Sequence, residues 1–123
     1  MKFAFLIMGE FDSSKDYASI HENEAQMIGV ASIEEARNVA RKLQEEGVDC
    51  IELCGAFGEN GAREIIEATE NKLPIGYATH LPEQDVVYAK TFPRSEERRV
   101  GKECRSRGSR GQEKKEIQTL QPP

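Results

Sequence analysis

The stretch Gly47–Gly61, GVDCIELCGAFGENG, decides the fold of this chain. Val48–Cys54 reads as a strand, a glycine-rich turn follows it, and Asn60 suits the N-cap of a helix over Ala62–Asn71. The apolar residues of the strand fall on both of its faces, as in a parallel sheet that is covered on both sides. This stretch therefore predicts a strand–turn–helix unit of an α/β protein.

Two further strands are expected before this unit. Lys2–Met8 is a continuous apolar run, typical of a central strand that is buried on both faces. Gln26–Ala31 reads as a second, shorter strand that Gly29 weakens. Between them, Phe11–Ala25 is rich in polar and turn-forming residues, and we expect a long loop there, of the kind that is often functional or mobile.

The strongest helix signal follows the second strand. Ser32 and Glu35 have the spacing of a capping box, and Gly47 readily adopts the left-handed conformation that ends a helix. The apolar residues between these signals recur at spacings of three and four and form one stripe: Ile33, Ala36, Val39, Ala40 and Leu43.

The sheet is expected to be completed before residue 93. Ile75–Thr79 reads as a fourth strand, and Pro82 is a good first residue for a helix that ends at Thr91. Strands that alternate with helices predict crossover connections. We therefore expect a single small α/β domain over residues 1–93, with a largely parallel sheet of about four strands flanked by helices. Three apolar residues of the last helix are expected to cover this sheet: Val86, Val87 and Phe92.

Net charge divides the chain into two parts. Residues 1–93 hold 8 Lys/Arg and 17 Asp/Glu, a net charge of −9, whereas residues 94–123 hold 9 and 5, a net charge of +4. Binding to phosphate backbones depends on Lys and Arg. The acidic part is therefore not expected to bind nucleic acid or anionic membranes.

The cysteines and the N-terminus favour a cytoplasmic protein. Cys50 and Cys54 would lie about 13 Å apart along one strand, too far for a disulfide, so we expect reduced thiols. The N-terminal apolar run ends at Gly9 without the cleavage pattern of a signal peptide. No run approaches the roughly 20 apolar residues of a membrane helix.

The segment after residue 93 is interpreted as a disordered, non-native tail. Residues 94–123 contain few apolar residues and no strand or helix period. Arg94–Arg107, RSEERRVGKECRSR, resembles the translation of a common sequencing adapter over fourteen consecutive residues. We therefore expect the native reading frame to be lost at about Pro93, and we exclude this tail from functional argument.

The part up to about residue 92 resembles a known family. The matching pieces are KFAFLIMG, SIEEA, IELCGAFGENGA, IIEAT and PIGYATHLPEQD. They are similar to short bacterial and archaeal proteins that are known only as a domain of unknown function. The resemblance implies a single α/β domain and no established activity.

The ends of the expected strands supply the candidate catalytic residues. Ligands of open α/β sheets bind beyond the carboxyl ends of the strands. If the strands are parallel, those ends bring Glu10, Cys54 and His80 to one rim. Cys54 precedes a helix start, which favours a reactive thiol, but free cysteine is more often a small buried apolar residue. His80 is either an acid/base group or a structural histidine bonded to a backbone carbonyl.

Weaker candidates surround this rim. Gly55, Gly58 and Asn60 could form an anion cradle of backbone N–H groups, although the segment lacks the motifs of phosphate and dinucleotide loops. His21 could close over the rim from the long loop, but a solvated loop histidine is the more common case. The spacing of Cys50 and Cys54 is not that of a metal site, so neither a metal nor another cofactor is expected.

Three functions are compatible with these residues. The first is a small enzyme that acts on a carbonyl or carboxylate metabolite, with Cys54 and His80 as nucleophile or acid/base and Glu10 orienting. The second is a ligand-binding or oligomeric module without catalysis, because a small sheet leaves edges and apolar surface that prompt self-association. A structural or partner-binding role is the third.

Overall fold

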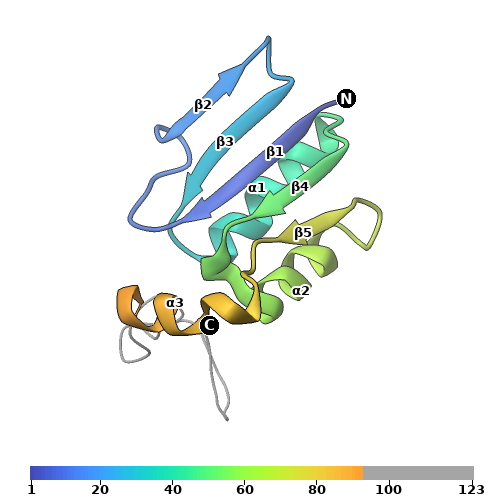
Figure 1. Ribbon diagram of the computed structural model, residues 1–123. Helices are drawn as coiled ribbons and strands as arrows, with labels where there is room; N and C mark the ends of the chain where they lie inside the picture. The colour runs from blue at the N-terminus through green and yellow to red at the C-terminus, as the bar shows by residue number, and fades with distance from the viewer. Residues whose placement is uncertain (93–123) are drawn as a thin grey trace.

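The computed structural model describes residues 1–92 (Figure 1). The expected tail, with its adapter-like segment Arg94–Arg107, lies outside the described residues. Within residues 1–92, no helix is long and apolar enough to cross a membrane.

The described residues form a five-stranded, mostly parallel sheet with helices, which confirms the α/β class (Figure 1). The strand order is β2-β3-β1-β4-β5. β1 pairs in parallel with β3 and β4, and β4 pairs in parallel with β5, whereas β2 is antiparallel to β3. The central position of β1 was predicted from its apolar run. The strands are β1 Phe3–Met8, β2 Tyr17–Ile20, β3 Ala25–Val30, β4 Cys50–Leu53 and β5 Ile75–Tyr77.

The prediction of a long loop over Phe11–Ala25 was wrong, because this segment contains β2. A turn over residues 12–16 precedes the strand and is held by hydrogen bonds from Ser14 N–H and Oγ–H to Asp12 Oδ1, at 2.9 and 2.7 Å. β2 then forms a hairpin with β3 through residues 21–23, all three with φ between 52° and 71°. All four residues of β2 are exposed, so the strand lacks the buried alternation that marks a strand in a sequence.

Helix α1, Ile33–Glu45, begins where the capping pattern predicted. Glu35 N–H donates to Ser32 Oγ at 3.0 Å. The Glu35 carboxylate, however, accepts from Ala31 N–H at 2.8 Å and from Ser13 N–H at 2.9 Å, rather than from the Ser32 backbone. It therefore ties the turn before β2 to the start of α1. Gly47, with φ +90°, follows the end of the helix as expected.

We predict that Glu35→Gln lowers the free energy of unfolding by about 1–2 kcal/mol at pH 7. The amide has only one acceptor oxygen, so it cannot accept from both Ala31 N–H and Ser13 N–H. Burial raises the pKa of Glu35, but the hydrogen bonds from Ala31 and Ser13 outweigh it, so the pKa lies below its ordinary value of 4.5. The ionised carboxylate thus stabilises the fold above pH 4.5, and this contribution is lost as the pH falls through the lowered pKa.

Urea unfolding at pH 7 and at pH 3.5 measures this difference. The gap between wild type and Glu35→Gln is expected to narrow at the lower pH. Glu34→Gln, at the neighbouring exposed position of the same helical turn, is the control and changes the stability by only a few tenths of a kcal/mol. Equal losses in the two variants would contradict the role assigned to Glu35.

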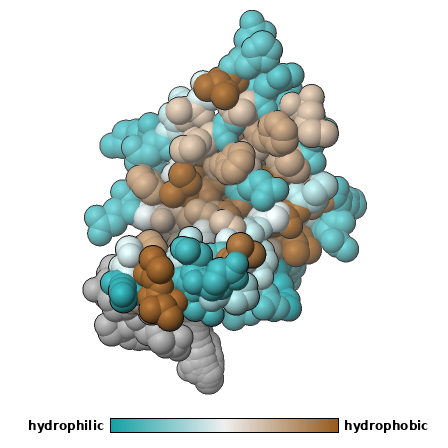
Figure 2. Space-filling model, viewed as in Figure 1, coloured by the Kyte–Doolittle hydropathy of each residue, from teal (hydrophilic) through white to brown (hydrophobic). Residues whose placement is uncertain are grey.

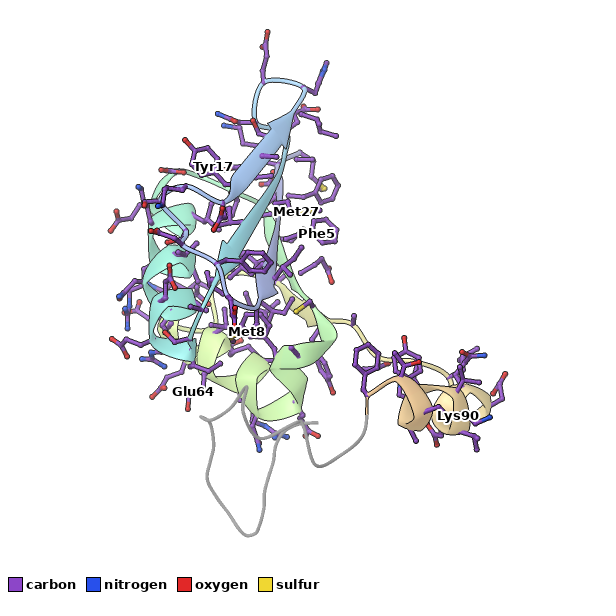
Figure 3. The ribbon with its side chains drawn as sticks, turned by 90° about the vertical axis from the view of Figure 1, so that its left-hand side faces the viewer. Phe5, Met8, Tyr17, Met27, Glu64 and Lys90 are labelled. Atoms are coloured by element: carbon purple, nitrogen blue, oxygen red, sulfur yellow. The ribbon has the colours of Figure 1, made fainter. Side chains whose placement is uncertain are left out.

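Both long helices cover the same face of the sheet (Figures 1 and 3). Helix α2, Gly58–Ala68, packs along α1, and Arg37 Nη1 bridges them by contacting Glu64 Oε1 at 2.9 Å and Glu67 Oε1 at 3.0 Å. The largest buried side chains lie between these helices and the sheet: Leu6, Val30, Ile51 and Ile65, with Thr69 bonded to the Ile65 carbonyl oxygen at 2.9 Å. The core is therefore one-sided.

Within residues 1–92, no helix covers the opposite face of the sheet, contrary to the prediction that β1 is buried on both faces. Side chains that alternate with the buried ones point to this face, which we call the open face, and Phe5 is 45% exposed. Figure 2 looks onto this face and shows apolar side chains across the strands. The exposed apolar residues of the open face are Phe3, Phe5, Ile20 and Met27, together with Phe11, which packs over Gly29.

The last helix does not cover the sheet either. Pro82 begins a 3-10 turn, η2, Pro82–Gln84, and α3, Asp85–Thr91, follows it. Figure 3 shows α3 projecting away from the rest of the molecule, on the side of the open face. The residues expected to cover the sheet are consequently exposed: Val86, Val87 and Phe92.

Candidate functional site

The carboxyl ends of β1, β3, β4 and β5 meet at one edge of the sheet, as the parallel order requires (Figure 1). The chain leaves β1 toward β2 and β3, and it leaves β4 in the opposite direction, toward α2 and β5. The strand pair β1–β4 is therefore the point at which the connections diverge. Ligands of open α/β sheets bind in the crevice at such a point.

Cys54 lies at this point of divergence. Its N–H donates to the Leu6 carbonyl oxygen at 3.0 Å, which extends the β1–β4 pairing by one step. Met8 N–H donates to Cys54 Sγ at 3.3 Å, so the half-buried thiol is fixed between the ends of the two strands. The strand is shorter than the expected Val48–Cys54: β4 covers Cys50–Leu53, and Cys54 is the first residue after it.

The glycine-rich segment after Cys54 is helical rather than a flexible turn. Residues Gly55–Phe57 form a 3-10 turn, η1, and α2 begins at Gly58, with φ +64°, well before the expected start. Asn60 therefore lies within the first turn of α2 and is not its N-cap. Phe57 is buried and anchors the segment, and no side chain caps the start of α2. The positive end of this helix consequently follows closely after Cys54.

His80 is held by two residues of the helix that follows it, α3. His80 Nε2 and Asp85 Oδ1 are 2.8 Å apart, and the imidazole stacks on Tyr88 with ring centroids 3.8 Å apart and an interplanar angle of 11°. Asp85 and Tyr88 are three residues apart in α3, so they lie on the same side of this helix. The Pro82 helix-start signal could have revealed this pair, but the sequence reasoning considered only the strand ends.

The other predicted site residues are distributed around the sheet. Glu10 is exposed at the rim, two residues after β1. Among residues 1–92, no hydrogen bond or ion pair joins Cys54, His80 and Glu10 to one another. His21 lies in the β2–β3 turn, at the opposite end of the parallel strands, and its highly exposed imidazole lies 3.8 Å from Glu24. This position prevents His21 from closing over the rim.

Cys50 provides an internal comparison for Cys54. It pairs with Phe3 in the β1–β4 register and so shares the open face. Burial raises the pKa of the Cys50 thiol, and the nearby Glu52 and Asp49 carboxylates raise it further. In residues 1–92, no group of three or more His, Cys, Asp or Glu side chains is arranged to hold a metal ion.

We predict that Cys50 is alkylated more slowly than an unstructured cysteine at neutral pH, because the thiolate is the reactive form. Its rate with iodoacetamide, followed by peptide mass spectrometry, should reach half of its maximum above pH 9.0, the ordinary value. Glu52→Gln should lower this midpoint, whereas Glu59→Gln, on α2, should not change it. A midpoint at or below the ordinary value would contradict the assigned environment.

The comparisons with known proteins concern the same part of the chain. The model of the Family of unknown function (DUF6506) matches residues 1–93, about three quarters of the sequence. The chain belongs to this DUF6506 family. None of the curated proteins and none of the solved structures compared with the chain matches it. Membership of the DUF6506 family agrees with the resemblance found in the sequence and adds no activity to it.

Proposed function

We propose that this DUF6506 protein binds a small carbonyl or carboxylate metabolite at the carboxyl ends of β1 and β4, with Cys54 in contact with the ligand. The observation that supports this proposal most is the hydrogen bond from Met8 N–H to Cys54 Sγ, 3.3 Å long. It fixes a thiol at the place where the connections of the sheet diverge, and ligands bind there in open α/β sheets.

The chemistry of this position is nucleophilic addition. The Cys54 sulfur forms a bond to the carbonyl carbon, the C=O π bond breaks, and the thiol proton passes to the oxygen, which gives a hemithioacetal. Backbone N–H groups at Gly55 and in the first turn of α2, around Asn60, would receive the oxygen or a carboxylate. Gly58 contributes the turn rather than a donor, because its N–H donates to the Gly55 carbonyl oxygen. His80 and Glu10 enter the proposal only as carriers of protons at the same edge of the sheet.

Protection of Cys54 from iodoacetamide tests the proposal. Acetaldehyde, acetate and pyruvate separate a carbonyl, a carboxylate and a keto acid as ligands, and peptide mass spectrometry reports each cysteine. A ligand at ten times its dissociation constant should slow the labelling of Cys54 about tenfold. Cys50 should be labelled at the same rate with and without it. Unchanged labelling of Cys54 in all three solutions, up to about 50 mM, would show that none of the three compounds binds there with millimolar affinity and would contradict the proposal.

The variants Cys54→Ser and Cys50→Ser distinguish specific binding from general reactivity. Cys50→Ser should retain the protection of Cys54. In native mass spectrometry with acetaldehyde, Cys50→Ser should show the added mass of the hemithioacetal, and Cys54→Ser should lack it. Turnover of any compound that persists in Cys54→Ser would assign the activity to other residues.

A second candidate function is a module that assembles with itself and has no catalytic activity. The open face favours it, because the side chains of a parallel sheet are almost always covered on both faces. This candidate does not require Cys54, so it is tested by the state of association rather than by labelling.

A further inference from the structure

Residues 1–92 leave two apolar surfaces without a covering layer of their own. The first is the open face of the sheet. The second is the arm, which we define as residues 81–92, that is, Leu81, η2, α3 and Phe92. Figure 3 shows that the arm and the open face border the same space, and Figure 2 shows apolar side chains on both. The exposed apolar residues of the arm are Leu81, Val86, Val87, Tyr88 and Phe92.

The course of the chain explains why one face of the sheet is uncovered. The crossovers from β3 to β4 and from β4 to β5 run in the same direction along the sheet, so right-handed connections place α1 and α2 on the same face. The connection from β1 to β3 runs in the opposite direction, and a helix there would have covered the other face. That connection forms the edge strand β2 instead.

We propose that a second copy of this chain supplies the missing layer, with the arm of each copy lying on the open face of the other. This contact has two-fold symmetry and uses each surface once per copy, so it closes at the dimer. The proposal is independent of the ligand site at Cys54.

The area of the two surfaces agrees with a dimer. If a large apolar side chain exposes about 200 Å² when free, the exposed parts of these side chains amount to about 480 Å² on the open face and about 570 Å² on the arm. A standard interface buries about 800 Å² on each partner. Neither surface reaches this area alone, whereas the two together do.

A short connection that His80 binds to α3 fixes the point at which the arm leaves the sheet. Ala78 N–H still donates to the Leu53 carbonyl oxygen at 2.9 Å, so the chain stays on the sheet edge up to this residue. Only three residues then precede η2. His80 binds Asp85 and stacks on Tyr88, which fixes α3 beyond the carboxyl ends of the strands. The arm is therefore presented to a neighbour rather than folded onto its own open face.

Sedimentation velocity of the full 123-residue chain across a range of concentrations tests the proposal. Wild type should form a dimer. Phe5→Asp, on the open face, and Val87→Asp, on the arm, should each raise the dissociation constant at least about tenfold. Tyr17→Asp is the matched control, because Tyr17 is exposed but lies on the other side of the sheet at the edge strand. It should leave the dissociation constant unchanged, and circular dichroism should show that all three variants fold.

Mixing the two variants identifies which surfaces touch. In a mixed dimer, one contact joins the intact arm of Phe5→Asp to the intact open face of Val87→Asp, and the other contact carries both substitutions. A second charge adds little to a contact that the first has already disrupted, so the mixture should dimerise more tightly than either variant alone. A mixture no tighter than its components would overturn the exchange of arms. A wild type that stays monomeric up to about 1 mM, or a dimer that both substitutions leave intact, would overturn the proposal as a whole. Val87 lies outside the core, so its variant remains informative if Phe5→Asp does not fold.

Discussion

Leu6→Ala is expected to lower the free energy of unfolding by about 3–4 kcal/mol, the range typical of a fully buried leucine. Leu6 has no exposed surface. It lies in the central strand β1, between strands β3 and β4, and its side chain packs under the helices. For a domain of this size, whose total stability is about 5–10 kcal/mol, this is a loss of a third or more. Urea unfolding followed by circular dichroism measures it.

Phe5→Ala is the matched control, because Phe5 is the next residue of the same strand and points to the open face. In dilute protein it should cost less than about 1.5 kcal/mol, since the side chain is only about half buried in one copy. If two copies cover this face, the cost should rise with protein concentration. Equal costs for the two substitutions in dilute protein would contradict a one-sided core.

The helix boundaries that depend on local chemistry were predictable from the sequence. Ser32 and Glu35 marked the start of α1, and Gly47 marked the residue after its end, because capping and a positive φ depend on a few neighbouring residues. The start of α2 was not predictable in the same way. Its N-cap is Phe57, which has no capping side chain and is fixed by its burial.

The coverage of the sheet could not be predicted from the apolar runs. The run Phe3–Met8 is equally apolar on both faces, yet only the face of Ala4 and Leu6 meets helices. Which face is covered depends on the direction of each crossover along the sheet, and that direction depends on the order of the strands. The four exposed residues of β2 gave no signal that an edge strand replaces a helix.

The candidate site was predictable in part. The position of Cys54 follows from the order of strand and helix, and its hydrogen bond from Met8 arises from pairing between segments 46 residues apart. His80 was predicted from the end of the fourth strand, but its partners belong to the following helix. A histidine two or more residues past a strand is positioned by the next element as much as by the strand itself.

Gly29→Ala is expected to lower the free energy of unfolding by about 1–3 kcal/mol, the usual cost of overpacking. The sequence suggested only that Gly29 weakens its strand. In the structure, a methyl group at this buried position would lie 2.5 Å from Phe11 Cγ and 2.7 Å from Phe11 Cβ. These atoms are the base of the side chain, so a rotation of the ring alone cannot relieve the overlap. Phe11 also lies over Gly9, at the carboxyl end of β1.

A double-mutant cycle identifies the cause of this loss. Phe11→Ala removes the ring, so Gly29→Ala should cost less in the Phe11→Ala background, with a coupling energy of about 1 kcal/mol or more. Urea unfolding of the four proteins gives this energy. Gly47→Ala is a useful comparison, because no atom lies within 4 Å of the added methyl group and the cost there comes only from the backbone, at φ +90°. Gly29 has no positive φ, so additive losses for Gly29 and Phe11 would contradict the ring as the cause of the loss.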